Sequence, residues 1–497
     1  MGKTGTIYQI QSACDNLSLV EEPQMVLFEE FELLNEKTRL NGSKKIKGDK
    51  GSLNGFSGND QTAIDLKALL NVENKLLSIY KNKMKDNFIL SRAVTFQLSK
   101  KLPVHNWFQY TQGFSPQIVD YYLDQWGSKK NDVFLDPFVG SGTSLLQCQS
   151  RGIKSYGWDI SPLSIFLSKV KTTPVDLKKV NLMLDSLYEK LKGSRKHSLS
   201  IPIELKEHFE KVFSQNILQQ LSIFQNWFIE QNESNELNFV LCAALSSLEE
   251  VSNIRKHGSH YRFMNNDNVG VNQKISFEGL SFVRSFKTKV QNQIADHSII
   301  NATPTALVSN SDARNSKLKN KVKADWVITS PPYLNRNNYI AQSKTEMFFG
   351  GLLKSFNEYR DLTKKTLRSH VEAESINEAP YRNALIDEMV NLVCKMGESY
   401  KGVSEMIHGY FEDMSSVLNN LVHSTKPNAK LAFIVGCSRW SGVVVPTDLL
   451  IAKIAEETGN YQLEQIEVVR YKGNAPQQMA KYGRHPVRES VVILKRI

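Results

Sequence analysis

The sequence is poor in cysteine and has no long apolar run. Its 497 residues include five cysteines, none of which forms a C-x-x-C pair. This spacing argues against a disulfide framework and against a structural zinc site. No apolar stretch reaches the ~18 residues that a membrane span needs, and the first residues lack the apolar segment of a signal peptide. We therefore expect a soluble, cytoplasmic protein with no metal ion and no membrane partner.

Acidic residues are outnumbered by basic ones, which gives a formal net charge of +11. A basic balance favours a polyanionic partner, because Lys and Arg neutralise phosphates and release counterions. Hydrophobic residues make up 41% of the chain, so a large core can form. The length allows one large catalytic domain with insertions, or two to three ordinary domains.

A β-loop-α-β pattern begins after Ser115, which is a predicted helix cap. Residues 133–135 form an apolar, strand-like run, and a turn with Gly140 and Gly142 connects this run to a predicted helix. A second predicted strand, residues 155–159, completes the unit. Such a unit opens a doubly wound, mostly parallel sheet.

Residues 175–301 have the spacing of amphipathic helices, with Asp176 as a predicted cap of the first one. The α/β pattern then resumes with a predicted strand over residues 324–329. Near the C-terminus, strands over residues 462–470 and 490–495 predict an antiparallel hairpin. The expected fold class is therefore α/β, a Rossmann-like doubly wound sheet with a C-terminal antiparallel hairpin and a large helical insertion.

The first chemical signal is the run D-P-F-V-G-S-G-T from Asp136 to Thr143. A glycine turn at the carboxyl end of a strand lets a ligand approach the backbone closely. Because G-K-[ST] is absent, the turn is not a P-loop. Asp159 ends the next strand, where a carboxylate can accept both hydroxyls of a ribose. The alternatives are an ordinary tight turn and, for Asp159, a surface cap of the turn that follows.

The second signal is Ser330-Pro331-Pro332-Tyr333, directly after the apolar strand. Consecutive prolines hold the backbone extended and provide carbonyl acceptors without N–H donors. Two acceptors, the Ser330 side chain and the Pro331 carbonyl, can hold the hydrogens of an amino group on a base and so expose its lone pair. Tyr333 can stack on an extruded base. Taken alone, a proline-rich turn would explain the same residues.

Together, in this order, the two runs resemble the motifs of the amino-group DNA methyltransferases of restriction-modification type. In that family D-P-F-x-G-S-G-T binds the cofactor and [DNS]-P-P-[YFW] is catalytic. Serine at the first position, here Ser330, is typical of the N4-cytosine branch, whereas N6-adenine enzymes usually carry Asp. The resemblance covers about residues 100–170 and 305–497. It implies S-adenosyl-L-methionine as cofactor and direct in-line methyl transfer to the exocyclic amino group of a flipped base in double-stranded DNA, with N4 of cytosine favoured.

The same resemblance implies specific site residues, including a motif near residue 110 that closes over the methionine part of the cofactor. Asp312 would accept the adenine amino group. The implied catalytic residues are Ser330, Pro331, Pro332 and Tyr333. The implied cofactor-binding residues are Tyr110, Phe114, Ser115, Asp136, Phe138, Gly140, Ser141, Gly142, Thr143, Asp159, Ile160, Asp312 and Ala313.

The resemblance also divides the chain into four regions. These are an N-terminal extension (1–90, with a flexible linker near 39–59), the cofactor-binding half of the methyltransferase core (91–174), the helical insertion (175–301), and the catalytic half (302–497). The insertion is the first candidate for target recognition, and the stretch 357–406 is the rival one. Predicted DNA contacts are Arg255, Lys256, Arg262, Arg336, Lys472 and Arg484.

Several alternatives stay open at this point. The nearest is the same chemistry on N6 of adenine. Others are an RNA methyltransferase, a methyltransferase of protein amides, a DNA-binding subunit without catalysis, and a methylase fused to a nuclease. A cognate restriction endonuclease is a further candidate partner. C5-cytosine methylation is excluded, because it needs a Pro-Cys nucleophile and the chain has no Pro-Cys dipeptide.

Overall fold

The computed structural model describes most of the chain after residue 70. The described residues are 71–497, apart from 194–197, 258–259, 264–280, 301–302, 305, 320–321, 336, 375–380, 398–401, 474–478 and 480. The predicted linker near 39–59 lies outside them. Within this described part, no helix is both long and apolar enough to span a bilayer.

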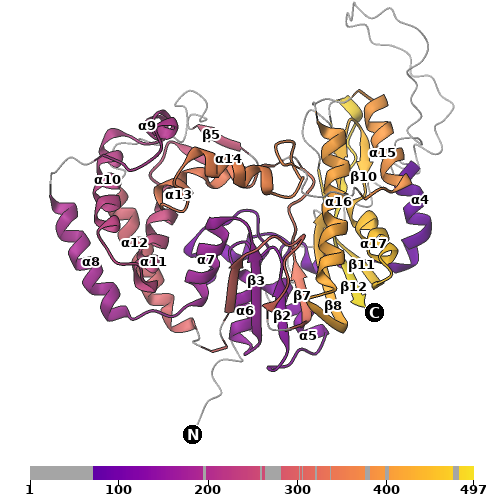
Figure 1. The fold of residues 1–497 in the computed structure, drawn as a ribbon, viewed down its shortest axis with the longest axis horizontal. Helices are drawn as coiled ribbons and strands as arrows, with labels where there is room; N and C mark the ends of the chain where they lie inside the picture. The colour runs from indigo at the N-terminus through magenta and orange to yellow at the C-terminus, as the bar shows by residue number, and fades with distance from the viewer. Residues whose placement is uncertain are drawn as a thin grey trace, which may run out of the picture. The chain divides into compact units, whose positions relative to one another are not determined.

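An eight-stranded sheet forms the core, in the order β1-β11-β12-β8-β7-β2-β3-β6 (Figure 1). Neighbouring strands are parallel except at β12, which is antiparallel to both β8 and β11. This confirms the predicted α/β class with its closing hairpin. The strands are β1 (Met84–Asp86), β2 (Val133–Asp136), β3 (Lys154–Asp159), β6 (Ala306–Asn310), β7 (Ala324–Thr329), β8 (Thr425–Gly436), β11 (Tyr461–Lys472) and β12 (Val487–Arg496).

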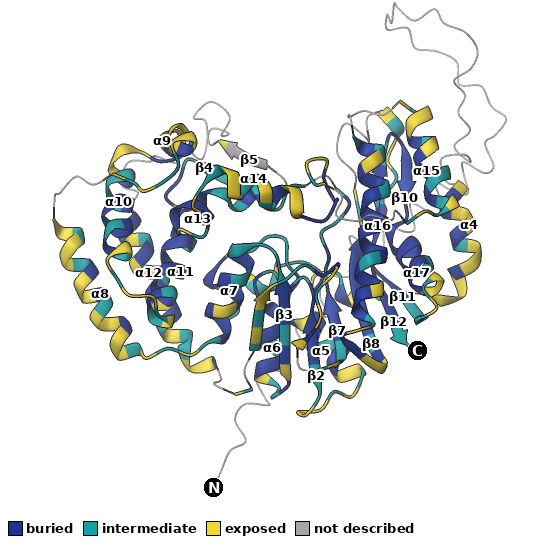
Figure 2. Ribbon diagram, in the orientation of Figure 1, coloured by how far each residue is buried: buried dark blue, intermediate teal, exposed yellow. Residues whose placement is uncertain are grey.

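The central strands are continuously apolar because helices cover both faces of the sheet. In β8, Leu431, Phe433 and Val435 belong to one core cluster, while Ala432 and Ile434 belong to another. The burial colouring shows the strands buried between these layers (Figure 2). One face packs against α15 (Ala384–Lys395), α16 (Val403–Leu421) and α17 (Thr447–Glu457), and the other against α5 (Pro116–Gln125) and α6 (Thr143–Ser150).

A helical lobe with its own apolar core lies beyond β3 (Figure 1). The chain leaves the sheet after β3 and returns at β6, the neighbour of β3, so the insertion leaves the strand order intact. As predicted, Asp176 caps the first inserted helix by accepting a bond from Lys178 N at 2.9 Å. The lobe contains α7 (Pro162–Thr172), α8 (Leu177–Lys192), α9 (Lys206–Val212), α10 (Gln215–Ile229), α11 (Asn235–Ser247) and α12 (Phe282–Asp296).

Two helices from the catalytic half also join this lobe. They are α13 (Lys344–Phe349) and α14 (Phe356–Lys365), and Met347, Phe348 and Phe349 are buried in its core. Two small hairpins accompany the main elements. They are β4 (Ile254–His257) with β5 (His260–Phe263), and β9 (Ser438–Trp440) with β10 (Val443–Val445).

The predicted N-terminal extension contains core elements from residue 71 onward. Helix α4 (Asn71–Tyr80) leads to β1, which pairs in parallel with β11 at the edge of the sheet. Glu73 of α4 forms an ion pair of 2.5 Å with buried Arg488 of β12, which also pairs with Asp448 of α17.

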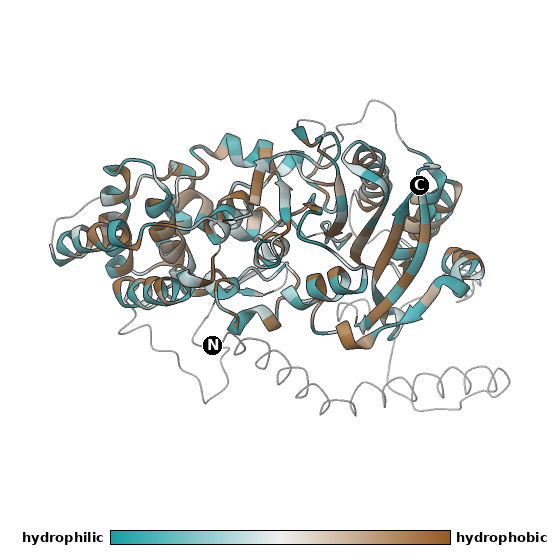
Figure 3. Ribbon diagram, turned by 90° about the horizontal axis from the view of Figure 1, so that it is seen from below, coloured by the Kyte–Doolittle hydropathy of each residue, from teal (hydrophilic) through white to brown (hydrophobic). Residues whose placement is uncertain are grey.

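The hydropathy colouring shows apolar residues concentrated along the strands (Figure 3). The described residues also form short 3-10 helices between the main elements. They are η2 (Lys81–Lys83), η3 (Phe88–Leu90), η4 (Leu98–Lys101), η5 (His105–Trp107), η6 (Ile203–Leu205), η7 (His297–Ile299) and η9 (Ala341–Ser343).

Candidate active site

The turn between β2 and α6 needs both of its glycines. Gly140 and Gly142 have φ values of +51° and +81°, a region that residues with a side chain rarely adopt. A Cβ on Gly140 would lie 3.2 Å from the Tyr110 ring, and one on Gly142 would lie 2.8 Å from Ser168 Cα. The turn is therefore packed tightly on two sides, with the Tyr110 ring directly over its backbone.

Asp136, at the end of β2, links the turn to the catalytic strand. Its carboxylate accepts a bond of 2.7 Å from Thr329 Oγ1 at the end of β7 and one of 3.1 Å from Phe138 N. It also accepts a bond from Ser144 of α6. Burial raises the pKa of Asp136 to about 6. This carboxylate fixes the carboxyl ends of β2 and β7 side by side.

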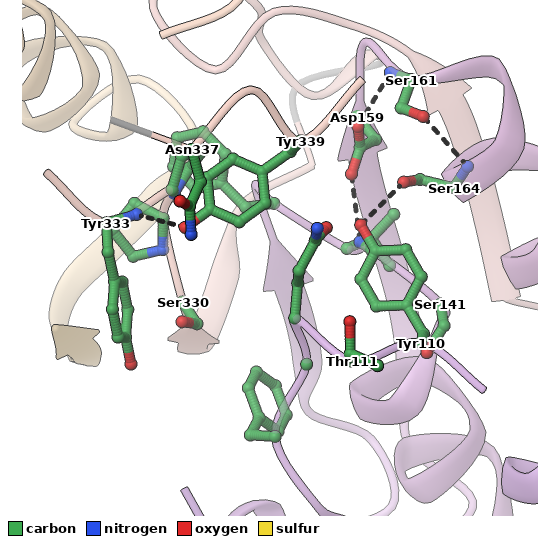
Figure 4. Close-up of a pocket in the computed structure, with 18 of the residues that line it drawn as sticks. Tyr110, Thr111, Ser141, Asp159, Ser161, Ser164, Ser330, Tyr333, Asn337 and Tyr339 are labelled. Atoms are coloured by element: carbon green, nitrogen blue, oxygen red, sulfur yellow. Dashed lines mark hydrogen bonds between the residues drawn. The ribbon is translucent and has the colours of Figure 1, made fainter. Parts of the chain in front are cut away.

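Asp159, at the end of β3, holds the other side of the turn (Figure 4). Its Oδ2 accepts a bond of 3.0 Å from Gly140 N, and its Oδ1 accepts one of 2.8 Å from Ser161 N. Each carboxylate oxygen can accept a further bond. Burial raises the pKa of Asp159 to about 6, so the group is mostly ionised at pH 7. The Tyr110 hydroxyl lies nearby, 3.3 Å from Ser164 Oγ.

The Ser330–Tyr333 motif begins where β7 ends. The backbone N–H of Tyr333 donates to the Tyr339 hydroxyl at 3.1 Å, and the Tyr333 hydroxyl donates to Glu489 Oε1 at 2.8 Å. Burial raises the pKa of Tyr333 well above its usual value, so the phenol stays protonated. In Figure 4, Ser330, Tyr333 and Tyr339 lie on one side of the view, and Tyr110 and Asp159 lie on the other.

Both motifs line the same cavity, whose volume is about 720 Å³. This volume lies in the usual range for ligand sites in proteins. The predicted cofactor-binding and catalytic residues that line it are Tyr110, Phe114, Phe138, Gly140, Ser141, Thr143, Asp159, Ile160, Asp312, Ala313, Ser330, Pro331, Pro332 and Tyr333. Lys256, a predicted DNA contact, lines it as well. Two motifs distant in sequence therefore meet at the carboxyl edge of the sheet, where open α/β sheets bind ligands.

Comparison with known proteins fits this arrangement, although no family model matches the sequence. The chain is 28% identical to type II methyltransferase M.BsoBI of Geobacillus stearothermophilus, over 81% of this chain and 87% of that protein. It is 24% identical to type II methyltransferase M.AvaI of Anabaena variabilis, over 84% of this chain and 92% of that protein. The chain is a homologue of type II methyltransferases. The predicted resemblance is thereby confirmed.

Two further similarities are weaker. Type II methyltransferase M.MvaI of Kocuria varians is 22% identical, over 72% of this chain and 82% of that protein. Among solved structures, TrmN from Thermus thermophilus aligns with a TM-score of 0.27 and 10% identity, over 77% of this chain and 49% of that chain. A structural likeness this low supports no conclusion about fold or function.

Three of the predicted cofactor residues lie behind the cavity wall. Ser115 is buried at the start of α5, and its hydroxyl donates to Thr95 O instead of capping the helix. Asp136 and Gly142 belong to the turn but are not among the lining residues. Their contacts shape the turn from within the protein.

Asp312, the predicted acceptor for an adenine amino group, lines the cavity and belongs to an ionic network. Arg314 Nη2 lies 2.7 Å from Asp312 Oδ2, and Arg314 Nη1 lies 3.1 Å from Asp413 Oδ2 on α16. Asp413 also pairs with Arg368 at 2.7 Å. Four hydrogen bonds from Arg314, through its backbone N–H, Nε and Nη2, fix the orientation of the Asp312 carboxylate.

The structure places Arg255 and Lys256 in contacts within the protein, and their phosphate contacts stay a prediction. Arg255 Nη1 donates to the carbonyls of Glu249 at 2.8 Å and Ser252 at 3.0 Å, at the end of the α11 region. Lys256 forms an ion pair with Glu346 of α13, and the two side chains are 10% and 3% exposed. The pair joins β4 to α13, so this lysine is not a solvated surface charge.

The other predicted DNA contacts differ in their surroundings. Lys472 lies beside the catalytic motif, with Nζ 4.9 Å from the centroid of the Tyr333 ring. Arg484 is exposed. The side chain of Arg262 and the whole of Arg336 lie outside the described residues.

Several cavity residues were not predicted from the sequence. One group follows α14, inside the stretch 357–406 that is the rival candidate for target recognition. Arg368, in the middle of that segment, is anchored by Asp413 and Glu412. Burial lowers the pKa of His370 in the same segment. The unpredicted lining residues include Thr366, Leu367, Ser369, His370 and Glu489.

Proposed function

We propose that this chain is an S-adenosyl-L-methionine-dependent DNA methyltransferase that acts on the exocyclic amino group of a base, with N4 of cytosine favoured. The observation that supports this best is the single cavity lined by both the glycine turn and the Ser330–Tyr333 motif. A methyl donor and an acceptor base must meet within bonding distance. The chain brings its two motifs together where such a meeting can occur.

The residues of the turn fit an adenosyl group. Gly140 lines the cavity, and Asp159 carries a mostly ionised carboxylate there. Its two oxygens each accept one backbone bond and retain capacity for the two hydroxyls of a ribose. Asp312 offers a second, fixed carboxylate for an exocyclic amino group. We therefore assign Asp159 to the ribose and Asp312 to the adenine of the cofactor.

The bound cofactor supplies an electrophilic methyl group, and the chain's own residues prepare the nucleophile. The Ser330 hydroxyl and the Pro331 carbonyl accept the two hydrogens of the base amino group, which frees the nitrogen lone pair from the ring. Tyr333 stacks on the extruded base. Placement of both reactants in the cavity displaces water, and their orientation lowers the barrier. The surplus proton of the methylated amine passes to solvent.

Double-stranded DNA is the proposed substrate because the homologues are type II methyltransferases and the chain carries a net charge of +11. Serine at position 330 favours cytosine N4 over adenine N6. For target recognition, four residues of segment 366–370 line the cavity. Lys256 lines it too, but its side chain is paired with Glu346, and Arg255 is bonded to carbonyls within the lobe. This favours the stretch 357–406 over the tip of the insertion.

The test is methylation of DNA by the purified chain, followed by mass identification of the modified nucleosides. We expect N4-methylcytosine in DNA treated with wild type and none with Ser330→Ala. N6-methyladenine would transfer the assignment to the adenine branch. Absence of any methylated nucleoside, in a wild-type sample that binds S-adenosylhomocysteine, would refute the proposed reaction. RNA treated in parallel is expected to remain unmodified.

A further inference from the structure

Three residues on adjacent strands form a row at the carboxyl end of β8. Gly436 of β8 pairs with Glu489 of β12, and Glu489 pairs with Arg470 of β11. The β11–β12 register shifts between Val468 and Arg470, so a bulge lies beside the row. Bulges near active sites redirect side chains. Here Glu489 and Arg470 both line the cavity that contains the catalytic motif.

Tyr333 lies across this row and is attached to it by its hydroxyl. The hydroxyl donates to Glu489 Oε1 at 2.8 Å, and the other carboxylate oxygen pairs with Arg470 Nε. The Glu489 side chain is only 3% exposed, so both bonds are shielded from bulk water. Bonds to an ionised acceptor in such surroundings are short and strong. Arg470 holds the carboxylate in an orientation in which its other oxygen meets the phenol.

Gly436 provides the space in which the ring lies. A Cβ at this position would be 2.9 Å from Tyr333 Cδ2, which is closer than real Cβ contacts allow. The same Cβ would also collide with Lys472 Nζ, which lies 4.9 Å from the centroid of the Tyr333 ring. A lysine over an aromatic ring is attracted by its π electrons. The ring is therefore held at its hydroxyl, along its edge and over its face.

We propose that Glu489, oriented by Arg470, is a positioning residue that holds the Tyr333 ring ready to stack on the target base. This inference rests on the proposed function, in which Tyr333 receives the extruded base. A phenylalanine ring at position 333 would still offer a face but would lose the bond to Glu489. Its orientation would then have to be set when the base arrives. We call the hydrogen bond from Tyr333 to Glu489 the tether. Its loss should slow the reaction step more than it weakens the binding of either substrate.

The kinetic test compares Tyr333→Phe, Glu489→Ala, Glu489→Gln and the double variant Tyr333→Phe/Glu489→Ala on a DNA substrate. Tyr333→Phe and Glu489→Ala are each expected to lower kcat about tenfold or more, because small misplacements slow a reaction strongly. KM for DNA and the affinity for S-adenosylhomocysteine should change little. Glu489→Gln should recover most of kcat, because its amide oxygen still accepts the phenol. The double variant should be no slower than the slower single variant.

A matched control is Glu464→Gln, which breaks a cross-strand ion pair with Lys430 at the other end of β11. It should leave kcat unchanged. The inference would be overturned if Tyr333→Phe had the kcat of wild type. It would also be overturned if the fall in kcat of the double variant equalled the product of the falls in the two single variants.

If wild type does not methylate DNA, the proposed function is refuted. A second measurement, which does not depend on activity, then still tests the tether. The midpoint of urea unfolding is measured for Tyr333→Phe, Glu489→Ala and their double variant. If the hydroxyl bonds to Glu489, the double variant shifts the midpoint by no more than the larger single shift. Additive shifts would show that the two residues do not interact, and would overturn the tether whatever the enzyme's activity.

Discussion

Replacement of Asp159 by asparagine is the sharpest test of the cofactor site. In the structure its two oxygens accept bonds from Gly140 N and Ser161 N and face the cavity. Ribose hydroxyls bonded to this carboxylate would contribute about 1.5–3 kcal/mol each, the usual value for a charged acceptor. Asparagine keeps one acceptor oxygen and places an amide NH₂ where the other was. We expect a loss of about 2 kcal/mol, which corresponds to a Kd roughly 30-fold higher.

Titration calorimetry with S-adenosylhomocysteine measures this Kd, and its pH dependence supplies a second readout. Burial raises the pKa of Asp159 to about 6, and the ionised form is the one that accepts the hydroxyls. Wild-type affinity should therefore fall as the pH drops through 6, and the Asp159→Asn protein should lack this part of the dependence. Asp136, whose pKa burial also raises to about 6, titrates in both proteins and cancels in the comparison.

Asp325→Asn is the matched control for this experiment. Asp325 also accepts a backbone bond at a strand end, from Val133 N at 2.9 Å, but it is not among the residues that line the cavity. It should bind S-adenosylhomocysteine as tightly as wild type. An unchanged Kd in folded Asp159→Asn would refute the assignment of Asp159 to the ribose.

Three further predictions concern the catalytic motif, buried Lys171 of α7, and the ion pair of Lys256 with Glu346. Ser330→Ala and Tyr333→Ala should lose methyl transfer but keep cofactor affinity, as measured by calorimetry; full turnover in either would contradict the catalytic assignment. Burial lowers the pKa of Lys171 from 10.5 to about 8, so wild-type stability should rise with pH between those values. Lys171→Met should be more stable than wild type by about 3 kcal/mol at pH 7, with the difference vanishing near pH 10.5, in urea unfolding. Lys256→Met should destabilise by about 3 kcal/mol, because it leaves Glu346 buried and unpaired. A second change, Glu346→Leu, should restore most of this loss, and the salt dependence of DNA binding should stay as in wild type; a smaller salt slope would return Lys256 to the DNA interface.

The parts of the site that could be predicted from the sequence are those encoded locally. The turn with Gly140 and Gly142, and the motif from Ser330 to Tyr333, each follow an apolar strand within a few residues. Strand ends in a parallel sheet meet at one edge. The family resemblance implied that these two motifs share a site, and the meeting of strand ends at one edge gives the physical reason.

The remaining features depend on contacts between distant residues, which local patterns do not encode. Lys256 stands in a basic run that suggests a solvated surface, but its partner Glu346 lies on a different helix. Glu489 occurs in the predicted hairpin, yet only the row it forms with Gly436 and Arg470 brings it to Tyr333. Charge alone does not reveal whether a residue meets solvent, a partner or a ligand.

The pairing of β1 with β11 sets the order in which the protein can assemble during translation. Met84 pairs with Ile466, so one of the first described strands to leave the ribosome is completed by one of the last. Until β11 and β12 are made, β8 presents an open edge and β1 has no strand to pair with. Open strand edges are where growing chains associate wrongly. The final hairpin is therefore the step that closes this side of the sheet and ends the period in which the nascent chain is vulnerable.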